Sequence, residues 1–135
     1  MPISSRWLIR SSYVCLLVGI IIGAFMLVHK AYALHPAIWS LLPVHIELLV
    51  MGWIVQFTMG TAYWILPRYL EGSSRGNTRL AQLMVLLLNV GIAVVIIDRL
   101  TVSSVPLGII GRTFEVAAVV LFVGLHWQRV VTYNS

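Results

Sequence analysis

The sequence predicts an all-α integral membrane bundle of four transmembrane helices that forms a single transmembrane domain over residues 1–135. Three observations predict it: 60% of the 135 residues are hydrophobic, only 10% are charged, and the apolar residues form long runs separated by short polar stretches. Soluble domains carry roughly 25% charged residues. An α-helix needs about 20 mainly apolar residues to cross a bilayer. The composition therefore fits the membrane as solvent, with lipid as a partner.

The four expected crossings cover residues 7–29, 41–66, 80–97 and 106–127. The second ends at Pro67 and Arg68, and the third at Asp98 and Arg99. A turn rich in glycine and serine over residues 72–77 separates these two crossings. The first run lacks a cleavage site and leads into further crossings, so we expect it to be retained and not removed as a signal peptide.

The Lys and Arg residues stand singly at the ends of apolar runs and form no cluster, which argues against a nucleic-acid partner. With the N-terminus inside the cell, six of the nine lie on the cytoplasmic side: Arg6, Arg10, Arg68, Arg75, Arg79 and Arg129. Because positive charge collects on the cytoplasmic side, both termini are expected there. We expect a multi-pass protein of the cell membrane, in bacteria the inner membrane.

One face of the second crossing carries most of the polar chemistry. At 100° per residue, this stripe contains His45, Leu49, Gly52, Gln56, Met59 and Tyr63. An ionisable residue inside a membrane span is costly and marks a candidate functional site. His45 suits an axial ligand of haem iron, and Gly52 would let the flat macrocycle lie against the backbone. In the alternative interpretation, His45 lies at the water interface and hydrogen-bonds a carbonyl or a lipid headgroup.

The stretch PVHIELLVMGWIVQFTMGTAYWILPR, residues 43–68, resembles the second transmembrane helix of the haem-copper oxidase subunit I superfamily. More closely, it resembles short four-helix membrane proteins related to that subunit and to NnrS-type haem proteins. The matching residues are His45, Gly52, Gly60, Tyr63, Trp64, Pro67 and Arg68. A weaker similarity covers roughly residues 41–130 and includes Leu80, Asn89, Gly91 and Arg99.

This resemblance implies that His45 is an axial ligand of haem b near the outer face, the end at which the charge count also places it. In the oxidases, later helices supply the second axial ligand and the histidines of the haem-copper site. This chain has no such helices. We therefore expect no copper site and no oxygen-reducing enzyme from this chain alone, although it could be a subunit of an oxidoreductase complex.

Three candidates exist for a second iron ligand. His29 ends the first crossing and His35 lies in the following loop, both on the side of His45. A second copy could instead supply its own His45 across a two-fold axis. His126 lies at the opposite end of the bundle, too far to share an iron with His45. Because His35 precedes Pro36, we expect it to be extended.

Other polar residues have alternative interpretations. Arg112 and Glu115 are spaced for a local ion pair, whereas Arg112 or Arg99 could contact haem propionates. Glu47 lies on the face away from His45, where we expect a solvated carboxylate. If the bundle or a partner subunit buries it, it could instead be protonated, pair with a cation or relay protons. Asn89 is expected to form an interhelical hydrogen bond.

The first crossing has two further features. Gly19 and Gly23 form a GxxxG motif, for a dimer face or for packing within the bundle. Cys15 is the only cysteine, so no intrachain disulfide can form.

The leading hypothesis is a haem b membrane protein that transfers electrons or binds a small gas such as O2 or NO. The alternative is a cofactor-free accessory or assembly subunit of a larger respiratory or photosynthetic complex, and homodimerisation is open. A third hypothesis is a quinone-binding anchor that uses His45, Gln56 and Tyr63.

Overall fold

The computed structural model describes residues 1–66, 77–101 and 106–131, apart from the side chains of 128–131, and these residues are almost entirely helical. The elements are α1 (Ile3–Tyr32), the 3-10 helix η1 (Pro36–Leu41), α2 (Leu42–Glu47), the π-helix η2 (Leu48–Val55), α3 (Gln56–Ile65), α4 (Thr78–Leu100) and α5 (Leu107–Val131). Together they form four helical segments long and apolar enough to cross a membrane: Ile3–Tyr32, Pro36–Ile65, Thr78–Leu100 and Leu107–Trp127. The prediction of an all-helical chain with four such segments is confirmed.

The connection between the first two segments is shorter than the sequence suggested. α1 continues to Tyr32 and ends at Ala33, whose left-handed backbone (φ 49°) lets its N–H donate to the His29 carbonyl at 2.7 Å. His35 is extended (φ −159°, ψ 129°), as expected for a residue before proline. The helix then restarts at Pro36, which suits a first helical position because proline has no N–H to satisfy.

The second connection is seen only at its ends. Asn77 caps α4, accepting hydrogen bonds from the N–H groups of Arg79 and Leu80. The expected stop at Pro67 and Arg68, and the turn up to Gly76, lie outside the described residues.

The uniform α-helical spacing expected for the second crossing is wrong between Leu48 and Val55, where the backbone forms a π-helix. A π-helix pairs each N–H with the carbonyl five residues earlier, so the side chains that follow are rotated relative to a regular α-helix. The later part of the predicted stripe nevertheless faces the interior, because Gly52, Gln56, Met59 and Tyr63 are all buried. His45 and Leu49, nearer the start of the crossing, are half-buried against α1.

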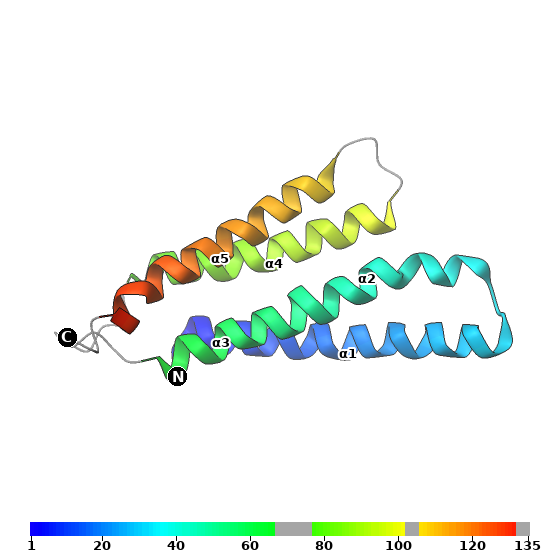
Figure 1. Ribbon diagram of the computed structural model, residues 1–135, viewed down its shortest axis with the longest axis horizontal. Coiled ribbons are helices and arrows are strands. Elements are labelled where there is room, and N and C mark those ends of the chain that lie inside the picture. Colours follow the sequence, from blue (N-terminus) through cyan, green and yellow to red (C-terminus); the bar gives the residue numbers. More distant parts are fainter. Residues whose placement is uncertain (67–76, 102–105, 132–135) are drawn as a thin grey trace.

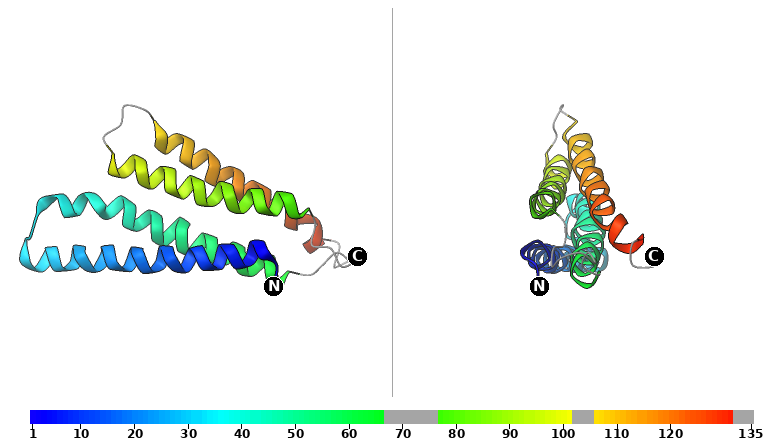
Figure 2. Two further views of the ribbon diagram at one scale, coloured as in Figure 1. Left: turned by 180° about the vertical axis from the view of Figure 1, so that it is seen from behind. Right: turned by 90° about the vertical axis from the view of Figure 1, so that its left-hand side faces the viewer.

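The segments form two hairpins that lie side by side (Figure 1). α1 packs along the second crossing, and α5 packs chiefly on α4, while α4 contacts the first hairpin. The two hairpins splay apart towards the end of α4 and the start of α5, and the start of α1 and the end of α5 lie at the opposite end (Figure 2). The shared core contains Leu8, Met59, Tyr63, Ala81, Met84, Leu88, Ile92, Ala118 and Leu125.

Small residues bring the helices together within each hairpin. A Cβ on Gly60 of α3 would lie 2.9 Å from the Leu8 Cβ of α1, and Ser5 Oγ donates to the Gly60 carbonyl at 2.5 Å. In the second hairpin, a Cβ on Gly91 of α4 would lie 2.9 Å from the Gly111 carbonyl oxygen of α5. Side chains at these positions would push the backbones apart, so glycine sets the helix spacing.

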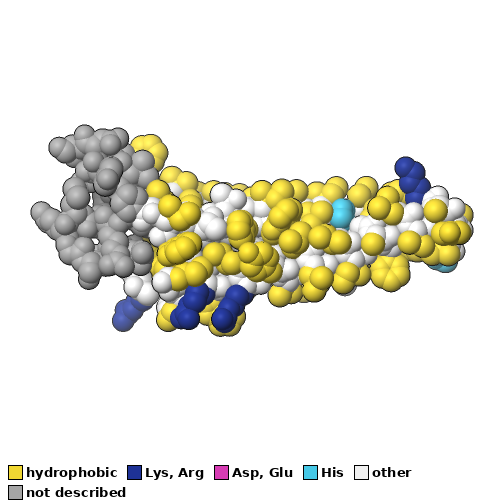
Figure 3. All heavy atoms as spheres, turned by 90° about the horizontal axis from the view of Figure 1, so that it is seen from below, with side chains coloured by type: hydrophobic (Ala, Val, Ile, Leu, Met, Phe, Trp, Pro, Cys, Tyr) yellow, Lys and Arg dark blue, Asp and Glu magenta, His cyan; other side chains and the backbone are white. Residues whose placement is uncertain are grey.

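The outer surface is apolar, as the composition predicts. Figure 3 shows hydrophobic side chains over most of one face, with Lys and Arg side chains near its two ends. Large side chains such as Leu17, Phe25, Leu27, Val116 and Val120 are more than half exposed. A water-facing surface of this kind would be unusual, whereas lipid tails solvate it readily.

Two glycine-to-alanine replacements test the packing. Gly60→Ala forces a methyl group onto Leu8, whereas a Cβ on Gly124 of α5 meets nothing within 4 Å. We expect Gly60→Ala to lower the free energy of unfolding in mixed micelles by about 1–3 kcal/mol relative to Gly124→Ala, since overpacking costs about that much. Gly124→Ala should be neutral or gain up to about 1 kcal/mol from helix propensity. Equal effects of the two changes would show that α1 and α3 do not cross at Gly60.

Candidate functional site

The His45 imidazole lies against the GxxxG segment of α1. Its Nδ1 is 2.8 Å from the Gly19 carbonyl oxygen, which fixes Nδ1 as the protonated nitrogen when the ring is neutral. A Cβ on Gly23 would lie 2.7 Å from His45 Cε1, so the ring occupies the space that this glycine leaves. Among the described residues, Nε2 has no hydrogen-bond partner and keeps its lone pair available.

His45 lines an open groove between α1 and the start of the second crossing. The groove has a volume of about 490 Å³. Its walls are mainly apolar, and its polar groups are Lys30, the Trp39 ring nitrogen and His45 itself; the lining residues are Ile20, Gly23, Ala24, Met26, Leu27, Lys30, Trp39, Leu42 and His45. An apolar groove with one basic nitrogen and one cation at its edge suits a flat, largely apolar molecule that carries a carboxylate.

His29 and His35 serve local structure at the same end of the bundle. His29 is buried, and its Nδ1 accepts a hydrogen bond from the His35 backbone N–H at 3.1 Å. The His35 Nδ1 in turn accepts from the Ala37 N–H at 3.2 Å, which caps η1. Neither histidine lines the groove of His45, although the His29 ring meets the Trp39 ring edge-on at 6.0 Å between centroids.

Gly52 and the GxxxG glycines are accounted for by packing between α1 and the second crossing. A Cβ on Gly52 would lie 2.8 Å from Cys15 Sγ, and one on Gly19 would lie 2.8 Å from Leu49 Cδ2. The GxxxG glycines, Gly19 and Gly23, therefore pack against the second crossing within the bundle, which is one of the two interpretations of this motif. Gly52 faces α1, away from the groove-lining residues.

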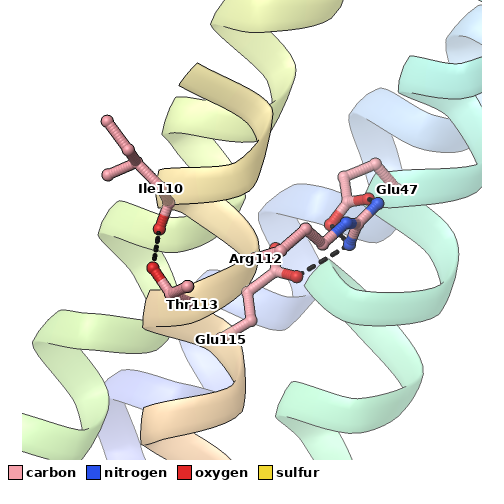
Figure 4. A network of polar contacts seen from close by, with 5 residues as sticks. All are labelled: Glu47, Ile110, Arg112, Thr113 and Glu115. Carbon is pink, nitrogen blue, oxygen red and sulfur yellow. Dashed lines mark hydrogen bonds and ion pairs between the residues drawn. The ribbon is translucent and has the colours of Figure 1, made fainter. Parts of the chain in front are cut away.

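Away from the groove of His45, a cluster of three charged side chains joins the two hairpins (Figure 4). Arg112 of α5 donates from Nη2 to Glu47 Oε2 at 2.5 Å and from Nη1 to Glu47 Oε1 at 3.1 Å. The same Nη1 donates to Glu115 Oε2 at 2.7 Å, which confirms the local pair that the i,i+3 spacing predicted. Glu47 and Glu115 are 3% and 2% exposed, whereas 48% of the Arg112 side chain is exposed.

Arg99 and Arg112 border a different groove from His45. This groove has a volume of about 740 Å³ and is lined by α4 and α5 residues that include Asp98, Arg99, Arg112 and Thr113. It shares no lining residue with the groove of His45. The structure therefore does not bring these two arginines together with His45 in one pocket.

A neutral polar network lies deeper in the bundle. Gln56 Nε2 donates to Asn89 Oδ1 of α4 at 2.9 Å and approaches Ser11 Oγ of α1 at 2.6 Å. The expected interhelical hydrogen bond of Asn89 is thus confirmed, with Gln56 as its partner. Gln56 is fully buried, and its Oε1 has no hydrogen-bond partner among the described residues.

At the opposite end of the bundle from His45, His126 is buried. Its Nδ1 lies 2.6 Å from the Phe122 carbonyl oxygen, and its ring packs edge-on against Tyr63. Tyr63 and His126 therefore lie together, away from His45, so His45, Gln56 and Tyr63 do not line one pocket.

Two features of the site were not predicted from the sequence. Lys30 borders the groove of His45 on the face of α1 that carries Gly23, and the hydrogen-bonded turn at Ala33 brings Trp39 back beside it. Glu47 binds Arg112 across 65 residues of chain. The expectation of a solvated carboxylate is wrong, because Glu47 is 3% exposed. Pairing with a cation, the alternative for a buried Glu47, is what the structure contains, although the sequence did not indicate Arg112 as the partner.

Within the described residues, no group of three or more His, Cys, Asp or Glu side chains converges in a way that could hold a metal ion. No protein-family model, curated protein or solved structure matches the chain. The proposals that follow therefore depend on the residues and their geometry.

Proposed function

We propose that this chain is a multi-pass membrane protein that binds haem b through His45 and acts in electron transfer or in the binding of a small gas such as O2 or NO. The observation that carries the proposal is the hydrogen bond between His45 Nδ1 and the Gly19 carbonyl. Histidines that bind metals usually donate their other ring N–H to a carbonyl or carboxylate, which fixes the tautomer and the ring orientation. His45 has this arrangement, and its Nε2 is available.

The surrounding residues fit a haem in three respects. The groove beside His45 is largely apolar and about 490 Å³ in volume. Gly23 and Ala24 add little side-chain bulk to the α1 wall of the groove, so a flat molecule could lie close to the backbone there. Lys30 stands at the groove edge, where its ammonium group could pair with a propionate. Gly52, Arg99 and Arg112 line no part of this groove, so they have no role in the proposed site.

Bound haem would supply a one-electron centre, or an open iron position for a diatomic gas. The residues of this chain would hold it: His45 through Nε2, the Gly19 carbonyl by orienting the imidazole, and Lys30 by neutralising carboxylate charge. Because His29 and His35 do not line the groove, a second ligand from the chain requires movement of the last turn of α1 or of the connection that follows it. Two histidine ligands would favour electron transfer, and one would favour gas binding.

The visible spectrum of the purified protein tests this proposal. We expect a Soret band that shifts on reduction with dithionite, and we expect His45→Ala to abolish it because the iron loses its ligand. Gly23→Ala should reduce the bound haem, since its methyl group would displace the His45 ring. His126→Ala is the matched control and should keep the normal spectrum, because His126 lies away from the groove.

The proposal fails if His45→Ala retains a normal reduced spectrum while eluting as a monodisperse protein. A colourless wild-type protein that co-purifies with other membrane subunits would instead support the cofactor-free accessory subunit. Replacing His29 and His35 singly by Ala then shows whether either contributes the second ligand.

We also infer that the four helices cross the cell membrane, the inner membrane in bacteria, with both termini in the cytoplasm. The start of α1 and the start of α4 lie at one end of the bundle, and Arg6, Arg10 and Arg79 lie there on the described residues (Figure 1). Lys30, Arg99 and Arg112 lie towards the other end, where Arg112 is paired with Glu47 and Glu115. Over the full sequence, six of the nine Lys and Arg residues fall on the side of the N-terminus, which supports an orientation in which that side faces the cytoplasm.

Cysteine labelling in intact cells tests the orientation. In a Cys15→Ser background, we expect Ser40→Cys to react with a membrane-impermeant maleimide added outside, and Thr78→Cys to react only after permeabilisation. Both positions are exposed in the structure, so access depends on the side of the membrane. The reverse labelling pattern would contradict the orientation, and labelling of both from outside would contradict a crossing between them.

A further inference from the structure

The cluster of Glu47, Arg112 and Glu115 holds more negative than positive charge when all three groups are ionised. Arg112 satisfies Glu47 with two hydrogen bonds, one from each terminal nitrogen. Glu115 receives a single bond from Nη1, to Oε2. Its other oxygen, Oε1, is buried and has no hydrogen-bond partner among the described residues.

An extra ionised carboxylate is unfavourable at this position. Glu115 is 2% exposed. Its side chain packs against α4, where a Cβ added to Gly91 would lie 2.9 Å from Glu115 Cγ. Taking an unpaired carboxylate out of water costs several kcal/mol, and such a group usually becomes neutral instead. The Glu115 and Glu47 carboxyl groups also lie close together, because Arg112 Nη1 donates to an oxygen of each. A proton on Glu115 would remove the repulsion between two neighbouring carboxylates.

The surroundings contain little that could neutralise the cluster in another way. A groove of about 340 Å³ reaches Arg112 and Glu115 between the hairpins, and its other lining residues are Met51, Val116, Val119 and Val120. These side chains offer no oxygen ligands, whereas hard metal cations need about six. On the outer side, Asp98 and Arg99 of α4 border the groove that Arg112 also lines, and their charges are opposite.

We propose that Glu115 is a proton-binding site, which carries one exchangeable proton on the carboxyl group that Arg112 satisfies at only one oxygen. With that proton the cluster is neutral, which suits its position among apolar side chains. The groove that Arg112 shares with Asp98 and Arg99 at the end of α4 gives the proton a route of exchange. The site does not depend on haem, because it shares no lining residue with the groove of His45.

Infrared spectroscopy of the full chain in lipid vesicles at neutral pH counts this proton through the C=O stretch of a protonated carboxyl group. We expect one such band in the wild type, with a downshift in D2O that shows exchange. Glu47→Gln and Glu115→Gln should each abolish it, because one carboxylate and one guanidinium already balance. Arg112→Gln should about double its area, because two buried carboxyls without a cation both bind protons.

Asp98→Asn is the control and should leave the band unchanged. The proposal is overturned if the wild type shows no protonated carboxyl, if both glutamine variants keep the band, or if Asp98→Asn removes it. Loss of the wild-type band in sodium buffer but not in potassium buffer would also overturn it, because the site would then bind a metal cation. The wild-type and Arg112→Gln spectra decide the matter even where a glutamate variant fails to fold.

Discussion

The ion pair between Arg112 and Glu47 is the interaction on which the relation between the two hairpins depends. The hairpins pack on each other through α4, which contacts α1, α2 and η2, whereas α5 packs chiefly on α4 and splays away from the first hairpin at its start (Figure 1). The ion pair ties this part of α5 to α2. Both terminal nitrogens of Arg112 bind the buried Glu47 carboxylate. Removing Arg112 would leave two buried carboxyl groups without a cation, and removing Glu47 would cut this link between the hairpins while Arg112 stays paired with Glu115.

The same pair sets the rotation of the second crossing. Residues two apart on a helix point in nearly opposite directions, so directing Glu47 towards α5 turns His45 towards α1. There the small residues of α1 make room for the imidazole, and the Gly19 carbonyl holds it. A carboxylate on one face and an imidazole on the other thus occupy separate sites, and the proposed proton site and the proposed haem site have distinct surroundings.

Much of this arrangement follows from local pattern, and the rest depends on long-range geometry. The number and order of the long apolar helices, the buried stripe from Gly52 to Tyr63 and the pair of Arg112 with Glu115 were predictable because each depends on neighbours in one helix. The observed helices extend beyond the expected crossings, because hydrophobicity reports the lipid-spanning part and not where the backbone stops being helical. The π-helix over Leu48–Val55 left no signal in an apolar run. The pairing of Arg112 with Glu47, and of Gln56 with Asn89, depends on how helices distant in sequence are rotated against one another. His29 and His35 cap the connection because the chain turns tightly at Ala33, which hydrophobic periodicity does not report.

A double-mutant cycle on Glu47 and Arg112 tests this account most directly. The free energies of unfolding of the wild type, Glu47→Gln, Arg112→Gln and the double variant would be measured in mixed micelles. The account predicts that each single change is destabilising and that the double change costs less than their sum, with a coupling energy of about 1–3 kcal/mol. Effects that add to within about 0.5 kcal/mol would show that the two side chains do not interact, and that this ion pair does not join the hairpins.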